Sequence, residues 1–265
     1  MIDEARIEEL VGEIGGTVGI CYEDLSSGST FQLNADESFP AASMIKAPVL
    51  WELFRAADQG RVDLSRTMTL SVAMKMEGWG VLKSLSDGLR MSLGDLATLM
   101  IVISDNVATD MVLSHLDFAS VNASMRELGL TGTELRHSMR GLSAGDAGAA
   151  ADQPNVTTPA DCARLFKAIH SGGVLSQAAH RAMNTILIQQ LDKAIIPRYL
   201  PPGVRCAHKT GETESVRHDA GIVLEPGRPY ALAILSKDAG PIDSLAVLYR
   251  IDTQLADLAR CFRPD

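Results

Sequence analysis

Residues 204–235, VRCAHKTGETESVRHDAGIVLEPGRPYALAIL, decide the fold of this chain. Short runs of β-branched and apolar residues at 204–208, 220–224 and 230–235 predict three strands. The last two are joined by Glu225-Pro226-Gly227-Arg228, a typical turn composition. We therefore expect the chain to end in antiparallel β-structure.

The first residues of the chain carry a matching β-signal. Residues 17–22 and 30–33 read as a hairpin with a turn at Ser26-Ser27-Gly28, after an amphipathic helix at 3–13. A further helix is expected from Pro40 to about Asp58, and a closing helix over 243–260.

The middle of the chain is mostly helical in pattern. Ser92 with Asp95, and Thr158 with Pro159 and Asp161, are typical of helix starts. The Gly- and Ala-rich stretch 141–151 predicts a long loop. Strands at both ends and helices between them predict an α+β fold of two lobes with a cleft. We assign 1–60 and 200–265 to a discontinuous sheet lobe, and 61–199 to a helical lobe.

Composition and charge limit the kinds of molecule that this protein could bind. The chain has 265 residues, 46% of them hydrophobic, and a net charge of −9. Without a basic run it is a poor candidate for nucleic acid. No apolar run reaches the roughly 20 residues needed to span a membrane. We expect a monomer that acts on a small molecule.

The sequence also limits the cellular compartments in which the protein could work and the states its cysteines could adopt. The acidic N-terminus does not resemble a signal peptide. The expectation is a cytoplasmic protein as the chain stands, or a periplasmic or secreted one if a leader was removed. Four separated cysteines, Cys21, Cys162, Cys206 and Cys261, favour free thiols over disulfides or a zinc site.

Three short motifs carry the chemistry. Ser43-Met44-Ile45-Lys46 fits S-x-x-K, Ser104-Asp105-Asn106 is S-D-N, and Lys209-Thr210-Gly211 is K-T-G. S-x-x-K alone is weak, but all three arise together by chance only about 5 times in 10,000 such chains.

The first motif supplies a nucleophile and a base. Ser43 and Lys46 lie one helical turn apart on one face. A serine hydroxyl needs a base to take its proton. Lys46 can serve if burial and a second cation, for which Lys209 is the candidate, lower its pKa.

The other motifs supply the remaining roles. Ser104 can relay a proton to a leaving nitrogen, while Lys209 and Thr210 can hold a substrate carboxylate. The amide of Glu212, directly after Gly211, would form an oxyanion hole with the amide of Ser43. This set contains its own nucleophile, base and oxyanion site, so no cofactor and no metal are expected.

Together the motifs resemble the class A β-lactamases and the wider superfamily of penicillin-recognising serine hydrolases. Residues 96–110, 155–161 and 217–222 also resemble segments of that family, so the likeness covers nearly the whole chain. The resemblance implies a β-lactamase/transpeptidase-like fold with Ser43 acylated in the cleft. Asn106 would bind a substrate amide, brace Lys46, or do both.

One departure from the family stands out in the omega-like loop, residues 131–157. Class A enzymes carry a Glu-x-x-x-Asn pattern there, whose Glu activates the deacylating water. This loop has no such pattern, and Met139 falls where that Glu belongs. Its acids are Glu134, Asp146 and Asp152, none at the matching place. A thioether accepts no proton, so we expect acylation followed by slow deacylation.

Several alternatives stay open. The same residues would suit an esterase, a D-amino-acid peptidase, an acyltransferase or a non-enzymatic covalent penicillin-binding protein. Trp79 could line the cleft, pack in the core or anchor a loop. Arg217 could bind a substrate carboxylate, with a structural Arg–Asp pair the favoured interpretation of Asp219. Cys206 and His208 alternate on one strand, where packing is favoured over metal binding.

Overall fold

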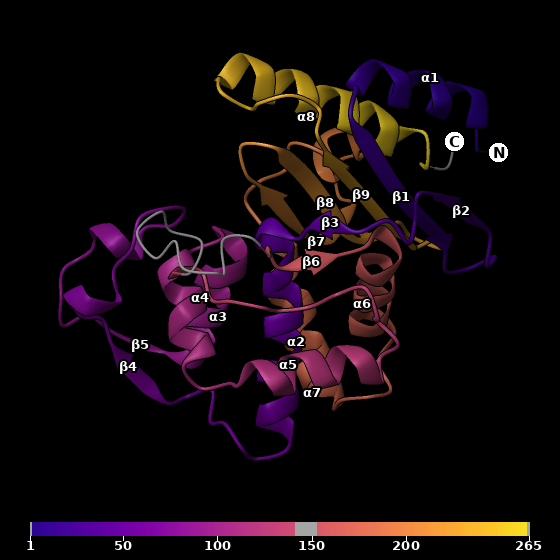
Figure 1. Cartoon of the computed structure of the whole chain (residues 1–265). Helices are drawn as coiled ribbons and strands as arrows, with labels where there is room; N and C mark the ends of the chain where they lie inside the picture. Colours follow the sequence, from indigo (N-terminus) through magenta and orange to yellow (C-terminus); the bar gives the residue numbers. More distant parts are fainter. Residues whose placement is uncertain (1, 141–152, 264–265) are drawn as a thin grey trace.

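The computed structural model describes residues 2–140 and 153–263. Its centre is a five-stranded antiparallel sheet in the order β2-β1-β9-β8-β7 (Figure 1). Strands from the two ends of the chain therefore pair directly, as predicted, with Ile20 opposite Ile234. The strands are β1 (Thr17–Asp24), β2 (Thr30–Leu33), β7 (Arg205–Glu212), β8 (Val216–Leu224) and β9 (Tyr230–Lys237).

Strand β7 is longer than its sequence pattern predicts. The apolar run stops at His208, but the strand continues through the K-T-G motif to Glu212. Its register on β8 places Lys209 opposite Ala220 and Glu212 opposite Arg217. Cross-strand pairing with β8 thus extends the strand past the residues whose polarity marked its end.

Two helices cover one face of the sheet. Helices α1 (Glu4–Ile14) and α8 (Leu245–Arg260) lie side by side on that face (Figure 1). The side chains of Asp3 and Ser244 cap their first turns by accepting backbone N–H bonds. Ile7, Leu10 and Leu255 are buried against alternate residues of the central strands. The two ends of the chain thereby form one hydrophobic core.

The opposite face packs against the helical part of the chain. Helix α6 (Pro159–Ser171) contacts β1, β8 and β9, and α7 (Gln177–Ile188) contacts β7. The predicted start of α6 is confirmed, with Thr158 as cap and Pro159 in the first turn. Helix α2 (Lys46–Asp58) is buried among these helices.

Helices α3, α4 and α5 complete the surroundings of α2. Ser92 and Asp95 form the predicted capping box at the start of α3. Two short antiparallel pairs, β3 with β6 and β4 with β5, join segments that lie apart in the sequence. These elements are α3 (Leu93–Val102), α4 (Asn106–Leu113), α5 (Phe118–Glu127), β3 (Phe39–Pro40), β4 (Thr67–Thr69), β5 (Arg90–Ser92) and β6 (Val156–Thr157).

The α+β fold class is confirmed, while the division into lobes at 60 and 200 stays a prediction. The predicted loop at 141–151 lies outside the described residues. Within 2–140 and 153–263, no helix has the length and apolar character to cross a membrane. Cys21, Cys162, Cys206 and Cys261 are free thiols.

Candidate active site

Ser43 lies in a short 3₁₀ helix, η1 (Ala42–Ile45), that leads directly into α2. The sequence predicts one continuous α-helix here, whereas the structure begins with a tighter 3₁₀ turn. Ala42 before Ser43 has φ +44°, a strained value for a residue with a side chain. The chain thus turns sharply at Ser43, whose side chain faces a cavity.

Lys46 is fully buried at the first position of α2. Its Nζ lies 2.6 Å from the Ser104 carbonyl, 2.8 Å from Asn106 Oδ1 and 3.0 Å from Ser104 Oγ. Ser104 has φ +56°, a left-handed conformation. Its carbonyl and its hydroxyl therefore both reach the same amine, which joins S-x-x-K to S-D-N across 58 residues of sequence.

The electrostatics favour a neutral Lys46. Burial, and then the nearby charge of Lys209, lower the pKa of Lys46 well below its usual 10.5. Two of its neighbours, the Ser104 carbonyl and Asn106 Oδ1, can only accept hydrogen bonds. A neutral amine has two N–H donors for them and a lone pair that can accept the Ser104 hydroxyl proton.

Lys209 is the second cation that the sequence predicts. It is fully buried on β7 and donates to the Thr210 carbonyl at 2.6 Å. Burial lowers the pKa of Lys209 to about 7, although Asp192 and Asp219 favour its charged form. The charge of Lys209 is the second cause, after burial, that lowers the pKa of Lys46.

Asp105, the middle residue of S-D-N, fixes one wall of the cavity. Its buried carboxylate accepts the backbone N–H groups of Val81 at 2.7 Å, Leu82 at 2.9 Å and Ala108 at 2.9 Å. Gly80 has φ +112°, and a Cβ there would lie 2.3 Å from that carboxylate. Only glycine allows the loop to approach Asp105 so closely.

Gly211 lets β7 pack against the turn that holds Ser43. A Cβ at this position would lie 3.1 Å from the Met44 side chain and 3.3 Å from the Ala41 carbonyl. The strand end that carries Thr210 and Glu212 is thereby placed beside η1. The three motifs converge on one place.

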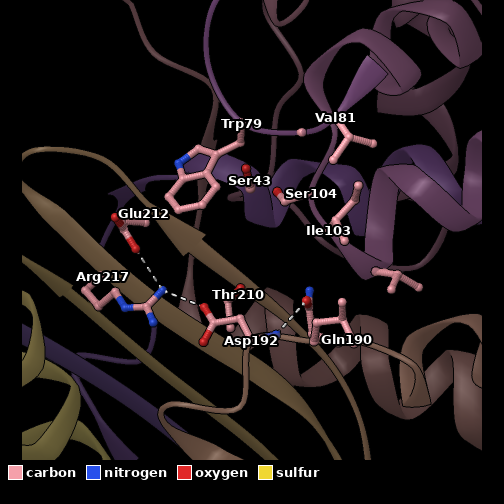
Figure 2. A pocket seen from close by; sticks show the side chains of 13 residues that line it. Ser43, Trp79, Val81, Ile103, Ser104, Gln190, Asp192, Thr210, Glu212 and Arg217 are labelled. Carbon is pink, nitrogen blue, oxygen red and sulfur yellow. Dashed lines mark hydrogen bonds and ion pairs between the residues drawn. The ribbon is translucent and has the colours of Figure 1, made fainter. Parts of the chain in front are cut away.

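A cavity of about 480 Å³ opens between these elements. Figure 2 shows Ser43, Ser104 and Thr210 around it, with Trp79 and Val81 on one side and Glu212, Arg217 and Asp192 on another. Trp79 is 58% exposed, so it forms part of the cavity wall rather than of the core. The lining residues are Ser43, Trp79, Gly80, Val81, Val102, Ile103, Ser104, Gln190, Leu191, Asp192, Thr210, Glu212 and Arg217.

Arg217 is the basic residue among those that line the cavity, and it is already paired. Its Nη1 lies 3.0 Å from Asp192 and 3.3 Å from Glu212, and its Nε lies 2.6 Å from Asp252. The structural Arg–Asp pair expected for Asp219 is wrong: Asp219 instead contacts His208 at 2.9 Å and accepts the Ile196 amide.

Sequence reasoning missed Asp192, which follows α7 in an irregular segment. It is an isolated acid outside every motif, so no local pattern marks it. Only tertiary packing places the Asp192 carboxylate beside Arg217 and Thr210.

The omega-like loop is only partly described. The Met139 side chain is buried, and its amide donates to Asp110 at 2.7 Å. Glu134 pairs with Arg136 at 2.8 Å. Asp146 and Asp152 lie outside the described residues. Within the described ranges, no group of three or more His, Cys, Asp or Glu side chains is placed to hold a metal. Cys206 and His208 therefore belong to no such group among these residues.

Comparisons with known proteins agree with this geometry. The model of the beta-lactamase enzyme family matches residues 4–259. A beta-lactamase from Sphaerobacter thermophilus is 31% identical, with a TM-score of 0.88 over 98% of this chain and 96% of that one. The protein PBP-A is 29% identical, with a TM-score of 0.82 over 96% and 94%. A variant of PBP-A, 28% identical with a TM-score of 0.81 over 96% and 94%, was solved as an acyl-enzyme complex with penicillin G.

Proposed function

The chain belongs to the beta-lactamase enzyme family, and on that premise we propose that this serine hydrolase is acylated at Ser43 by a β-lactam or a related amide or ester. The observation that carries the proposal is the buried Lys46 amine, held between Ser104 and Asn106 beside the cavity that Ser43 lines. A lysine is costly to bury, and the lowered pKa of Lys46 favours its neutral amine, the form that can act as a base.

Acylation follows from this arrangement. The Ser43 oxygen attacks the substrate carbonyl carbon and forms a C–O bond, while Lys46 takes the hydroxyl proton. The C–N bond of the amide then breaks. The Lys46 amine returns the proton through the Ser104 hydroxyl, 3.0 Å away, to the leaving nitrogen.

The developing negative charge on the carbonyl oxygen needs N–H donors. The amides of Ser43 and Glu212 are the proposed pair, because Gly211 packs its strand against the turn that holds Ser43. Such donors typically contribute about 10² to 10³ in rate. Lys209 and Thr210 are the proposed anion-binding groups, and Asn106 braces Lys46.

Deacylation is proposed to be slow. Water must add to the ester carbonyl and release Ser43 with its proton, which needs a base beside the ester. Met139, which a gap-free reading from Thr133 places at the family's position for that base, carries a thioether and is buried away from the cavity lining. The acyl-enzyme should therefore persist, as it would in a covalent penicillin-binding protein.

Intact-mass measurement over time with penicillin G tests the proposal. We expect an increment of one whole penicillin molecule, its loss over minutes to hours, and no increment in Ser43→Ala. Ser86→Ala, which removes an exposed serine, is the matched control and should be labelled like the parent. A Ser43→Ala protein that is still labelled would refute the nucleophile.

Turnover separates the related activities. Rapid hydrolysis of penicillin G with no trapped adduct would refute slow deacylation. Hydrolysis of nitrophenyl esters without labelling by penicillin would favour the esterase or peptidase alternative. Transfer of the acyl group to an added amine would favour the acyltransferase.

A further inference from the structure

A buried histidine on β8 faces the turn that carries Ser43. His218 is fully buried, and it lies opposite Gly211 of the K-T-G motif in the pairing of β8 with β7. Its Nε2 lies 2.8 Å from the carbonyl oxygen of Pro40, a few residues before Ser43. This ring is therefore a direct link between the sheet and the chain that leads to the proposed nucleophile.

The partners of the ring fix which nitrogen carries the proton. The backbone N–H of Ser236 on β9 donates to Nδ1 of His218 at 3.2 Å, so Nδ1 acts as the acceptor. Nε2 then carries the proton and donates it to the Pro40 carbonyl, which can only accept. Burial lowers the pKa of His218 to about 4, so the ring is neutral near neutral pH. The Phe39 ring packs edge-on against it, with ring centroids 6.1 Å apart.

The segment just before the nucleophile must be held by its surroundings. Ala42 has φ +44°, and a residue with a side chain keeps such a conformation only where neighbouring contacts enforce it. The Ala41 amide donates to the Asn155 carbonyl at 2.7 Å, and the Pro40 carbonyl accepts from His218. These two groups belong to one peptide unit, and in a planar trans peptide they point in opposite directions. The unit is thus held from both sides, by the chain before β6 and by β8.

The same ring lies against the strand that supplies the second proposed oxyanion donor. A Cβ on Gly211 would lie 3.3 Å from Cδ2 of His218 and 3.3 Å from the Ala41 carbonyl oxygen. The amide of Glu212 follows Gly211 directly in the chain, and the amide of Ser43 lies in the turn on the other side of the ring's contact. His218 therefore borders both chain segments that carry the two donors.

We infer that His218 is a positioning residue for acylation, which sets the spacing between the amides of Ser43 and Glu212 by holding the turn against the sheet. His218 is not among the described residues that line the cavity, so it acts through the two donors and not on the substrate. Such donors must lie where the negative charge develops, and a displacement of about 1 Å can cost about 10²-fold in rate. The inference rests on the proposed acylation of Ser43.

Substitutions that keep or remove the Nε2 donor test the inference. His218→Leu removes both ring nitrogens. His218→Gln keeps an N–H donor near the place of Nε2, whereas His218→Asn offers a polar group near the place of Nδ1. Intact-mass time courses at several penicillin G concentrations separate the limiting acylation rate from binding. We expect His218→Leu and His218→Asn to lose about 10- to 100-fold in the limiting rate with little change in the half-saturating concentration, and His218→Gln to keep most of the native rate.

His180 is the matched control, because its ring makes the same kinds of bond at a distance from the cavity lining. It is buried on α7, its Nδ1 lies 2.9 Å from the Ile169 carbonyl, and the Leu175 amide donates to its Nε2 at 3.3 Å. His180→Leu should therefore lose stability in urea unfolding, as His218→Leu does, and still be acylated at the native rate.

The possible results separate the inference from the proposed function. A native limiting rate in His218→Leu, equal rates in His218→Gln and His218→Asn, or an equal loss in His180→Leu would overturn the inference and leave the acylation of Ser43 intact. The comparison of Gln with Asn decides the question if His218→Leu does not fold. Absence of an adduct in the native protein would overturn the proposed function, and this inference with it.

Discussion

Replacing Asp105 by alanine should both destabilise the protein and loosen one wall of the cavity. The carboxylate of Asp105 is fully buried and serves three backbone N–H groups, those of Val81, Leu82 and Ala108. Val81 also lines the cavity, so the same bonds that hold the loop shape the site.

The magnitude follows from those three donors. Loss of the helix cap at Ala108 costs about 1 kcal/mol. The buried Leu82 amide left without a partner costs about 2 kcal/mol, and the half-buried Val81 amide costs less because water can reach it. We expect a loss of about 3–4 kcal/mol in the free energy of unfolding, which corresponds to roughly 10 °C in Tm for a protein of this size.

Urea and thermal unfolding measure the effect, and Asp117→Ala is the matched control. Asp117 also caps a helix, α5, by accepting the Ser120 amide, but it is exposed and serves no loop. The control should lose only about 1 kcal/mol and keep its rate of acylation. The reasoning fails if Asp105→Ala loses no more stability than Asp117→Ala, or if its cavity reacts with penicillin at the native rate.

Three further expectations follow from the buried amines and the helix caps. Lys46→Arg should lower the acylation rate by about 10² to 10⁴, because a guanidinium stays protonated and cannot act as a base; unchanged kinetics in the mass assay would exclude Lys46. The native protein should gain stability as pH rises from about 7 to about 10, because unfolded chains protonate Lys209 in that window and the folded protein, with its pKa of about 7, does not. Lys209→Met should remove the part of this dependence that Lys209 contributes, and Lys46 should keep its own part. The stability advantage of Lys209→Met over the native protein, measured by urea unfolding, should therefore be largest near pH 6 and shrink towards pH 10; an advantage that grows with pH would contradict the assignment. Ser92→Ala should cost about 1 kcal/mol through loss of the capping box of α3, and should leave acylation unchanged in the same mass assay.

Much of the fold could be predicted from periodicity and helix caps. The strands near both ends show runs that match their burial, and Ser92 and Thr158 mark helix starts because their side chains satisfy N–H groups only a few residues away. Boundaries that depend on partners were less predictable. Strand β7 runs to Glu212 because β8 pairs with it, and the tight turn of η1 lies where β7 packs beside it.

By itself, the order of residues determined the α+β class and the three motifs, since each rests on local spacing and on a rare combination of residue types. Only the tertiary structure decided what surrounds the motifs. The Lys46 amine meets Ser104 across 58 residues, and Asp192 meets Arg217 on one side of the cavity. Neither contact has a local signal, because packing of α2, α7 and the sheet creates it. The arrangement of charged side chains around the cavity therefore belongs to the folded protein alone.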